Sequence, residues 1–453
     1  MRLPLAPLAL SFVGFVSACS SVTTATDDPP VSSRGDKEAE GRSTEPVATP
    51  ATPEEAPEGP ATTCADGAFT CVDVTTAGPY GTRTFDVPAA QNWVNTGVFL
   101  HLGETATIEV SGDDWVLNPD KAGRAIDHGK CVIGAPVARI GLSYKDPEIT
   151  CLGRRTTLTA DKDGILFVGG LADNDLGESY EARVDARGKK QFTVTSDGAT
   201  VPSVAAEDAA TYAFDNVASG WVEVYGDHVV MTLPVATAQK DASTLAAAAR
   251  RLDDIYELHE KLRGARPHHG QRLRFFPDEV APGYMLAGNP IRVKAAVVSG
   301  KDEARISRAG EATNDPWGFA HEMGHDFTFA TGFWQYQNKS LEAWPNVFSI
   351  HALEALGLPI HDQAAGCTST STGSYLTTES WSPWTALCFL MQLKFDHGWE
   401  LYERFFAAIN TNHTMPNQGS GEKTAWYFVH DRFEEAAKAD VTPTFAAWNV
   451  PHP

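Results

Sequence analysis

Hydrophobic and polar positions alternate with a period of two over residues 64–201. In Thr105–Val110 every second side chain is apolar, and the run Gly97–Leu102 precedes it across a Gly-Glu turn. Gly164–Val168 and Lys190–Thr195 are further candidate strands, separated by Gly and Asp residues. Successive side chains of a strand point to opposite faces, so this alternation is typical of half-buried strands. Short strands at this spacing predict an all-β antiparallel sandwich over residues 64–201.

The pattern changes at about residue 202. Trp221–Tyr225 and His228–Pro234 are typical of strands, whereas Ala242–Leu262 carries apolar residues every three or four positions. Leu387–Ile409 and Lys423–Ala439 also have helical spacing. The sequence therefore predicts a second domain, of α+β class, over residues 202–453.

The N-terminus predicts export. An apolar run, Leu3–Val16, follows a basic start and is too short to span a bilayer comfortably, so residues 1–18 are typical of a signal peptide. The run ends in Val16-Ser17-Ala18-Cys19, which resembles a bacterial lipobox. That resemblance implies that Cys19 is lipidated and anchors the chain to the bacterial envelope, and Ser20 favours the outer membrane. A plain signal peptide with a nearby Cys is the alternative.

Residues 19–63 predict a disordered tether. From Ser20 to Thr63 there are seven prolines, no aromatic residue, and nine acidic against three basic residues. Such a segment buries too little apolar surface to offset its chain entropy, and its prolines and like charges extend it. The whole chain has 36 basic and 58 acidic residues, a net charge of −22. This charge repels phosphate backbones, so nucleic acid is not an expected partner.

Cysteine usage agrees with export. Besides Cys19 there are six cysteines, an even number that predicts three disulfides in an exported chain. Six cysteines allow 15 pairings, and proximity along the chain favours Cys64–Cys71, Cys131–Cys151 and Cys367–Cys388. The chain has no C-x-x-C pair, so a cysteine zinc cluster is not expected.

The candidate chemistry lies in His321-Glu322-Met323-Gly324-His325. On a helix, positions i and i+4 share a face, so both imidazoles can bind one metal ion while Glu322 points to the same place. Asn314 or Asp315 can cap this helix, and Pro316 suits its first turn. Neutral imidazole suits zinc, so Zn²⁺ is the expected cofactor. Two surface histidines on a helix are the structural alternative.

A third ligand is expected downstream. Glu342 follows His325 by 17 positions, and two His with a Glu from the next helix is the gluzincin arrangement. The string around it, with Asn346, Phe348 and Ser349, resembles the enhancin or M60 peptidase family. Pro345 departs from that family and predicts a later start for the helix.

The resemblance covers most of residues 221–451. It includes Trp221–Pro234, Met285–Ile291, Gly398–Tyr402 and Asp440–Trp448. Asn289 and Leu286 replace a Tyr and a His of the family, and Thr328 replaces a Gln, so fine substrate contacts differ.

The first domain resembles the galactophilic LecA-like lectin fold, in Asn92–Gly103, Cys131–Ala135 and Gly164–Tyr180. Those lectins hold sugar through calcium. In the corresponding loop Asp175 and Ser179 could be ligands, but Ala182 and Arg183 occupy the positions of paired Asn. Ala offers no ligand and Arg repels the ion, so an ordinary calcium site is not expected. A spacer or docking module is the alternative to a lectin.

The resemblances together imply a zinc endopeptidase of the bacterial surface that cleaves O-glycosylated, mucin-like proteins. They assign His321, His325 and Glu342 to zinc, and Glu322 to the water proton as general base. Asn346 and Trp344 are possible substrate contacts, and His351, Tyr336 or Asn346 could stabilise the oxyanion. A non-catalytic glycan-binding adhesin and a general zinc peptidase without glycan dependence are the alternatives. The sequence does not fix the oligomeric state.

Overall fold

The computed structural model describes most of the chain after residue 78. The described residues are 79–91, 93–112, 115–117, 131–144, 148–172, 186–281, 283–299, 305–329, 341–375, 382–411 and 422–453. The predicted signal peptide, Cys19, the tether, the Cys64–Cys71 pair, the calcium loop and Tyr336 lie outside them. Within the described ranges, no helix has the length and apolarity that a membrane crossing requires.

Eight strands between residues 79 and 200 form an antiparallel sheet with the order β5-β4-β7-β2-β8-β3-β6, and β1 also pairs with β8. The strands are β1 Pro79–Pro88, β2 Val94–Leu100, β3 Thr105–Ser111, β4 Pro136–Ile140, β5 Thr150–Cys151, β6 Arg155–Thr159, β7 Gly164–Gly170 and β8 Lys189–Thr200. The 12-residue β8 joins two groups of strands, because it pairs with β1 and β3 along most of its length and with β2 at its end. Ile108, Leu166 and Phe192, from three of these strands, share one buried core.

A second sheet of six strands follows, with the order β13-β14-β12-β11-β10-β9. Its strands are β9 Ser203–Ala205, β10 Trp221–Tyr225, β11 Val229–Pro234, β12 Leu273–Pro277, β13 Met285–Leu286 and β14 Ile291–Val293. The sheet is mixed, since β10 runs antiparallel to β11 while β11, β12 and β14 run parallel. Val224, Met231 and Phe275 from this sheet share a core with the helices, as an α+β domain requires.

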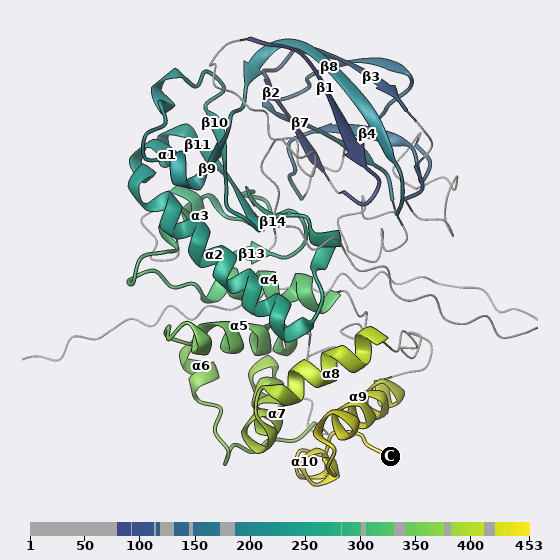
Figure 1. Ribbon diagram of the computed structural model, residues 1–453, viewed down its shortest axis with the longest axis vertical. Helices are drawn as coiled ribbons and strands as arrows, with labels where there is room; N and C mark the ends of the chain where they lie inside the picture. The colour runs from purple at the N-terminus through teal and green to yellow at the C-terminus, as the bar shows by residue number, and fades with distance from the viewer. Residues whose placement is uncertain are drawn as a thin grey trace, which may run out of the picture. The chain divides into compact units, whose positions relative to one another are not determined.

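Ten α-helices are described in this second part of the chain (Figure 1). They are α1 Val235–Lys240, α2 Ala242–Arg263, α3 Ala295–Ser299, α4 Trp317–Phe329, α5 Ala343–Ala355, α6 Asp362–Ala365, α7 Pro383–His397, α8 Glu400–Thr411, α9 Glu422–Ala437 and α10 Thr442–Ala447. The segment 387–409, predicted to be helical, forms two helices, because α7 ends at His397 and Gly398 (φ 78°) separates it from α8. A positive φ suits glycine and terminates the helix.

Hydrogen bonds link the two sheets within the compact unit Thr62–Pro453. Gln271 Nε2 donates to the carbonyl of Ala90 at 2.5 Å, and Arg292 Nε donates to the carbonyl of Leu142 at 2.8 Å. Arg274 and Glu223 form a buried ion pair on the second sheet, and Arg274 also lies over the ring of Phe167 in β7. The face of the second sheet that turns away from the helices is therefore covered by residues of the first sheet.

Candidate metal centre

The helix that carries the predicted motif is capped by one of the two expected residues. The backbone N–H of Trp317, the first residue of α4, donates to Asp315 Oδ1 at 3.0 Å. The side chain of Asn314 instead donates to the carbonyl of Arg305 at 2.9 Å. Asp315 is therefore the cap, and the negative charge of its carboxylate lies at the positive end of the helix dipole.

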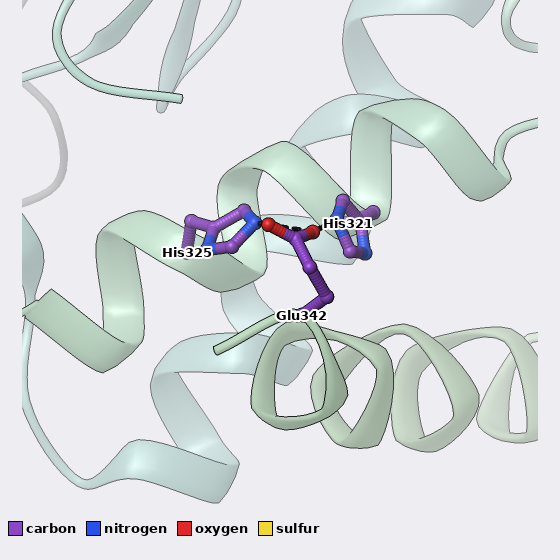
Figure 2. Close-up of side chains that lie close together, drawn as sticks. All are labelled: His321, His325 and Glu342. Atoms are coloured by element: carbon purple, nitrogen blue, oxygen red, sulfur yellow. Dashed lines mark hydrogen bonds and ion pairs between the residues drawn. The ribbon is translucent and has the colours of Figure 1, made fainter. Parts of the chain in front are cut away.

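Three predicted ligands converge between α4 and the start of α5 (Figure 2). Glu342 Oε2 lies 3.0 Å from His321 Nε2 and 3.3 Å from His325 Nε2. One ligand atom from each of the three residues lies within 4.8 Å of the others. Their side chains are largely buried, with exposed fractions of 13%, 6% and 16% in the order His321, His325 and Glu342.

These separations fit a metal ion. Bonds of about 2.0–2.1 Å in a tetrahedral arrangement place neighbouring ligand atoms about 3.3 Å apart. The observed distances of 3.0 and 3.3 Å agree with that spacing. Glu342 Oε1 is buried without a hydrogen-bond partner among the described residues, so it is free to accept from a water molecule or to join the metal. Two imidazoles and a carboxylate form a donor set that zinc binds in proteins, with a fourth position left for water.

Asn346 fixes the orientation of the first histidine. Asn346 Oδ1 lies 2.6 Å from His321 Nδ1, and Asn346 Nδ2 donates to the carbonyl of Glu342 at 2.7 Å. The amide oxygen can only accept, so His321 Nδ1 carries a proton, and Nε2 is the nitrogen that would bind the metal. Asn346 thus holds two of the three predicted ligands, and its roles as a substrate contact or an oxyanion donor stay predictions.

Gly324, inside the motif, sets the distance between the two helices. A Cβ atom at this position would lie 2.8 Å from the carbonyl oxygen of Pro345 and 3.0 Å from its Cα. Only glycine permits this approach, which brings Glu342 to the histidines. The expected late start of the second helix is wrong, because α5 begins at Ala343 and includes Pro345 in its first turn. Proline is tolerated there because the first backbone N–H groups of a helix have no partner within it.

Burial and neighbouring charges shift the pKa of three groups at the site, Glu342, His321 and Glu322. Burial raises the pKa of Glu342, but hydrogen bonds from His321 and His325 outweigh it and hold that pKa far below its usual range. Burial lowers the pKa of His321, and the hydrogen bond to Glu342 with the charge of Glu322 reverses this, so the net shift is upward. Burial raises the pKa of Glu322, and the two histidines partly oppose it. Glu322 is thus a partly desolvated carboxylate beside the ligands, as a general base requires.

Two other predicted residues lie away from the ligands. Trp344 is fully buried, and its ring lies nearly parallel to those of Phe405 and Phe433 at centroid distances of 5.7 and 6.3 Å. It is therefore a core residue, and the expected substrate contact is wrong. His351 packs edge-on against Trp399 at 5.0 Å and is buried near Leu258. Burial lowers the pKa of His351 to about 4, so the imidazole is neutral near pH 7.

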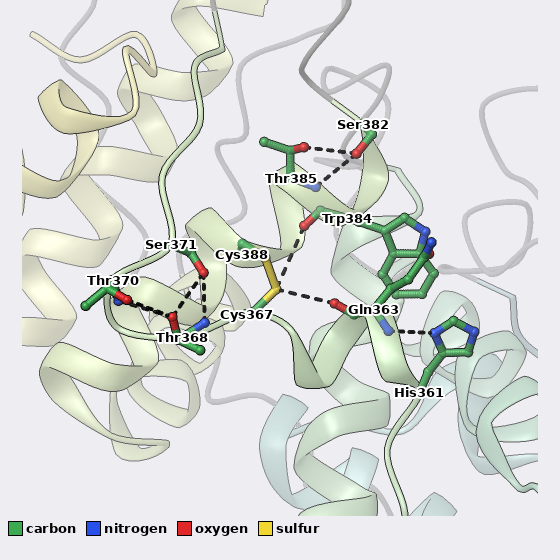
Figure 3. The surroundings of a disulfide bond; sticks show 10 residues. All are labelled: His361, Gln363, Cys367, Thr368, Thr370, Ser371, Ser382, Trp384, Thr385 and Cys388. Carbon is green, nitrogen blue, oxygen red and sulfur yellow. Dashed lines mark hydrogen bonds between the residues drawn. A yellow bond between two sulfur atoms is a disulfide. The ribbon is translucent and has the colours of Figure 1, made fainter.

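Two of the three predicted disulfides are present, Cys131–Cys151 and Cys367–Cys388. Each lies within one predicted domain. The second bridge ties the segment after α6 to the first turns of α7 (Figure 3). It lies close to Trp384, whose ring stacks on His361 with centroids 4.8 Å apart. Trp317, one turn before His321, packs against the same pair at 5.6 and 6.2 Å.

The described residues contain one other group of potential ligands, His430, Asp431 and Glu434 on α9. Asp431 Oδ1 lies 3.3 Å from His430 Nδ1, but Glu434 Oε1 lies 3.8 Å from Nε2 at the other side of the ring. Thr442 Oγ1 already bonds that Nε2 at 3.1 Å. The imidazole is therefore engaged at both nitrogens, unlike the convergent set on α4.

The family described as "Peptidase M60, enhancin and enhancin-like" matches residues 212–449, which include all three predicted ligands and Glu322. The chain is 26% identical over 247 residues to a TRPM8 channel-associated factor homolog of Xenopus laevis, covering 52% of this chain and 26% of that protein. It is 25% identical over 385 residues to TRPM8 channel-associated factor 3 of Rattus norvegicus, covering 80% and 38%. The chain thus spans well under half the length of these curated relatives.

Solved structures share the fold at low identity. A functionally unknown conserved protein from Bacillus anthracis str. Ames matches with a TM-score of 0.58 at 15% identity, over 82% of this chain and 76% of that one. A metallopeptidase in complex with Tn antigen matches with a TM-score of 0.54 at 14% identity, over 82% and 72%. The M60 catalytic domain of Clostridium perfringens ZmpC, in complex with sialyl T antigen, matches with 0.50 at 13%, over 79% and 72%.

Proposed function

Because this chain belongs to the peptidase M60 family of enhancin and enhancin-like proteins, we propose that it is a zinc-dependent endopeptidase that cleaves O-glycosylated, mucin-like proteins. One observation carries the proposal: His321, His325 and Glu342 converge at metal-ligand spacing beside the carboxylate of Glu322. This is the gluzincin ligand set, with the base one residue after the first histidine.

Each residue has a distinct role in peptide hydrolysis. His321, His325 and Glu342 hold the zinc ion, which supplies Lewis-acid polarisation of the scissile carbonyl and of water. Glu322 accepts the proton of the attacking water and later passes it to the leaving amine. Asn346 keeps His321 in the tautomer that binds metal.

The glycan preference is supported by proteins of the same fold. The metallopeptidase bound to Tn antigen and the M60 domain bound to sialyl T antigen share the architecture of this chain over about four-fifths of its length. Both antigens are O-linked glycans.

A pair of matched peptides tests the proposal. The zinc-loaded protein is incubated with a peptide carrying a single Tn antigen on Ser or Thr and with its unglycosylated twin, and new termini are mapped by mass spectrometry. We expect cleavage of the glycopeptide beside the modified residue, loss of cleavage with a chelator, and recovery with Zn²⁺. The variant Glu322→Gln should retain zinc and lose turnover, because Glu322 is a base and not a ligand.

The alternatives give different results in the same assay. Equal cleavage of both peptides would indicate a general zinc peptidase without glycan dependence. Binding of the glycopeptide without cleavage by the zinc-loaded protein would indicate a non-catalytic adhesin. Full zinc content in Glu342→Ala would contradict the assignment of the third ligand.

The location at the bacterial envelope is a separate proposal, supported by Val16–Cys19 and the acidic, proline-rich tether. We propose that Cys19 is lipidated and that the tether holds the enzyme away from the membrane surface. The mass of the mature N-terminal peptide tests this in cells that produce the full chain. A diacylglyceryl modification on Cys19 is expected, with release or loss of processing in Cys19→Ala. A mature chain that begins after residue 19 without lipid would contradict it.

A further inference from the structure

The face of α4 opposite the metal ligands carries three buried polar contacts from the segment 259–268. His259 Nε2 donates to the carbonyl of Ala320 at 2.8 Å, and Arg263 Nε donates to the carbonyl of Phe327 at 3.1 Å. His268 Nε2 lies 3.1 Å from Asp326 Oδ1, and these two side chains are 1% and 0% exposed. The contacts come from the last two turns of α2 and from the short 3-10 turn Pro267–Gly270.

These contacts flank both metal-binding histidines. The carbonyl of Ala320 directly precedes His321, and Asp326 directly follows His325. At about 100° per residue, Asp326, Phe327 and Ala320 lie on the side of the helix away from His321 and His325. One side of α4 therefore meets Glu342 and the other side meets α2.

We propose that His259, Arg263 and His268 form a clamp on α4, and that its members are positioning residues for the two metal-binding histidines. The inference rests on the proposed zinc site. It adds a function for residues that do not touch the metal position and that the sequence motif does not include.

Apolar packing alone would not position α4 in this way. Around the clamp, Phe327 packs against Tyr256 and Phe348 with ring centroids 5.1 and 6.1 Å apart. Apolar contact is non-directional, so a helix held by it alone can rotate or slide. An imidazole nitrogen lies about 6 Å from the helix axis, so a rotation of about 10° moves it by about 1 Å. Metal–ligand distances tolerate only about 0.2 Å. Directed hydrogen bonds at both ends of the motif prevent such a rotation.

The clamp lowers the stability of the fold relative to apolar side chains in the same positions. His268 and its neighbour His269 adopt left-handed backbone conformations, with φ of 48° and 56°. Such conformations are unfavourable for non-glycine residues and persist where surrounding contacts fix them. Asp326 Oδ2 and the Nδ1 atoms of His259 and His268 are buried without a hydrogen-bond partner among the described residues. Buried polar atoms without partners reduce stability, so hydrophobic packing would be the more stable solution if stability were their only role.

Zinc affinity of the full chain, measured by chelator competition, tests the clamp independently of peptidase activity. Asp326→Leu preserves the helix and removes the acceptor, whereas Asp326→Asn keeps an oxygen at the same position. We expect Asp326→Leu to bind zinc about 10- to 100-fold more weakly and to alter the visible spectrum of the Co²⁺-substituted protein. Asp326→Asn should retain most of the affinity and the wild-type spectrum. His268→Asn, which tolerates the left-handed backbone but shortens the side chain, should resemble Asp326→Leu.

Asp253→Asn is the matched control. Asp253 is another buried carboxylate on α2, but it accepts from the backbone N–H groups of Asp227 and His228, which lie between β10 and β11. This variant should lower Tm and leave zinc affinity and the Co²⁺ spectrum unchanged. Wild-type affinity and spectrum in both Asp326→Leu and His268→Asn would overturn the clamp, as would equal losses in Asp253→Asn. If Asp326→Leu does not fold, His268→Asn decides.

The two proposals fail in different ways. A wild-type chain that binds zinc but cleaves no peptide contradicts the proposed activity and leaves the clamp measurable. A wild-type chain that binds no zinc overturns both.

Discussion

Replacing Gly324 by Ala tests whether the approach of α4 and α5 creates the metal centre. The added Cβ would lie 2.8 Å from the carbonyl oxygen of Pro345, where ordinary contact begins at 3.4 Å, so the helices must separate by about 0.6 Å. The clashing atom belongs to the backbone of α5 and cannot rotate away as a side chain could. Glu342 lies three residues before Pro345, so its carboxylate is displaced together with the helix. A displacement of this size is about three times the 0.2 Å that metal–ligand bonds tolerate.

We therefore expect Gly324→Ala to weaken zinc binding by at least about tenfold, because Glu342 no longer reaches the position shared by the histidines. Isothermal titration or chelator competition on the purified chain measures this. The stability of helix α4 itself should not decrease, since Ala is favoured over Gly in a helix interior by about 1 kcal/mol. A loss of zinc with little loss of helicity by circular dichroism is the expected combination.

Gly318→Ala is the matched control on the same helix. A Cβ there would approach Met285 Cε at 2.9 Å, and this flexible side-chain end can move aside. We expect normal zinc affinity and equal or higher Tm. Wild-type zinc affinity in Gly324→Ala would refute the reasoning, as would equal losses in the two variants.

Three further predictions concern the surroundings of the site. Asn346→Leu should weaken zinc binding about 10- to 100-fold, because His321 loses the acceptor that fixes its tautomer; unchanged affinity in a competition assay would contradict this role. Burial lowers the pKa of His351 to about 4 in the folded chain, below the ordinary value of 6.5, so its contribution to stability is complete above pH 6.5 and is lost as the pH falls towards 4. His351→Phe should therefore gain Tm relative to the wild type as the pH is lowered from 7.5 to 5, and a Tm difference independent of pH would refute it. Cys388→Ala opens a bridge between residues 21 positions apart and should cost about 3 kcal/mol in the free energy of unfolding, measured by urea denaturation; no change in the urea midpoint would show that the bridge does not stabilise the fold.

Local spacing accounts for what the sequence predicted correctly. Trp221–Tyr225 and Ala242–Leu262 appear within a residue of their predicted bounds as β10 and α2. The strand and helix periods depend only on neighbouring residues, so one chain segment contains the information. The helical spacing of apolar residues continues across Gly398, but the backbone there has a positive φ that ends α7. The spacing therefore did not predict the break between the two helices.

Contacts between distant segments account for what the sequence left open. It offered both Asn314 and Asp315 as caps, and the hydrogen bond of Asn314 to Arg305 decides between them. It offered Trp344 as a substrate contact, and the stacking of this ring on Phe405 and Phe433 places it in the core. Each answer depends on which segments pack together. The residues next to a tryptophan in the sequence do not show whether its ring faces a ligand or packs in the core.

The sequence by itself determined the chemistry of the candidate site, because His321 and His325 share a helix face through a four-residue spacing that any α-helix provides. The choice of Glu342 needed a family resemblance, since no local rule links residues 17 positions apart across two helices. Only the tertiary structure decided how the site is held: the glycine contact that brings α5 to α4, the amide of Asn346 on His321, and the buried pair of His268 and Asp326. These contacts join residues 21 to 58 positions apart, and their distances depend on how whole helices pack. A sequence motif therefore identifies two of the three candidate metal ligands, whereas the packing of helices sets their distance from the third.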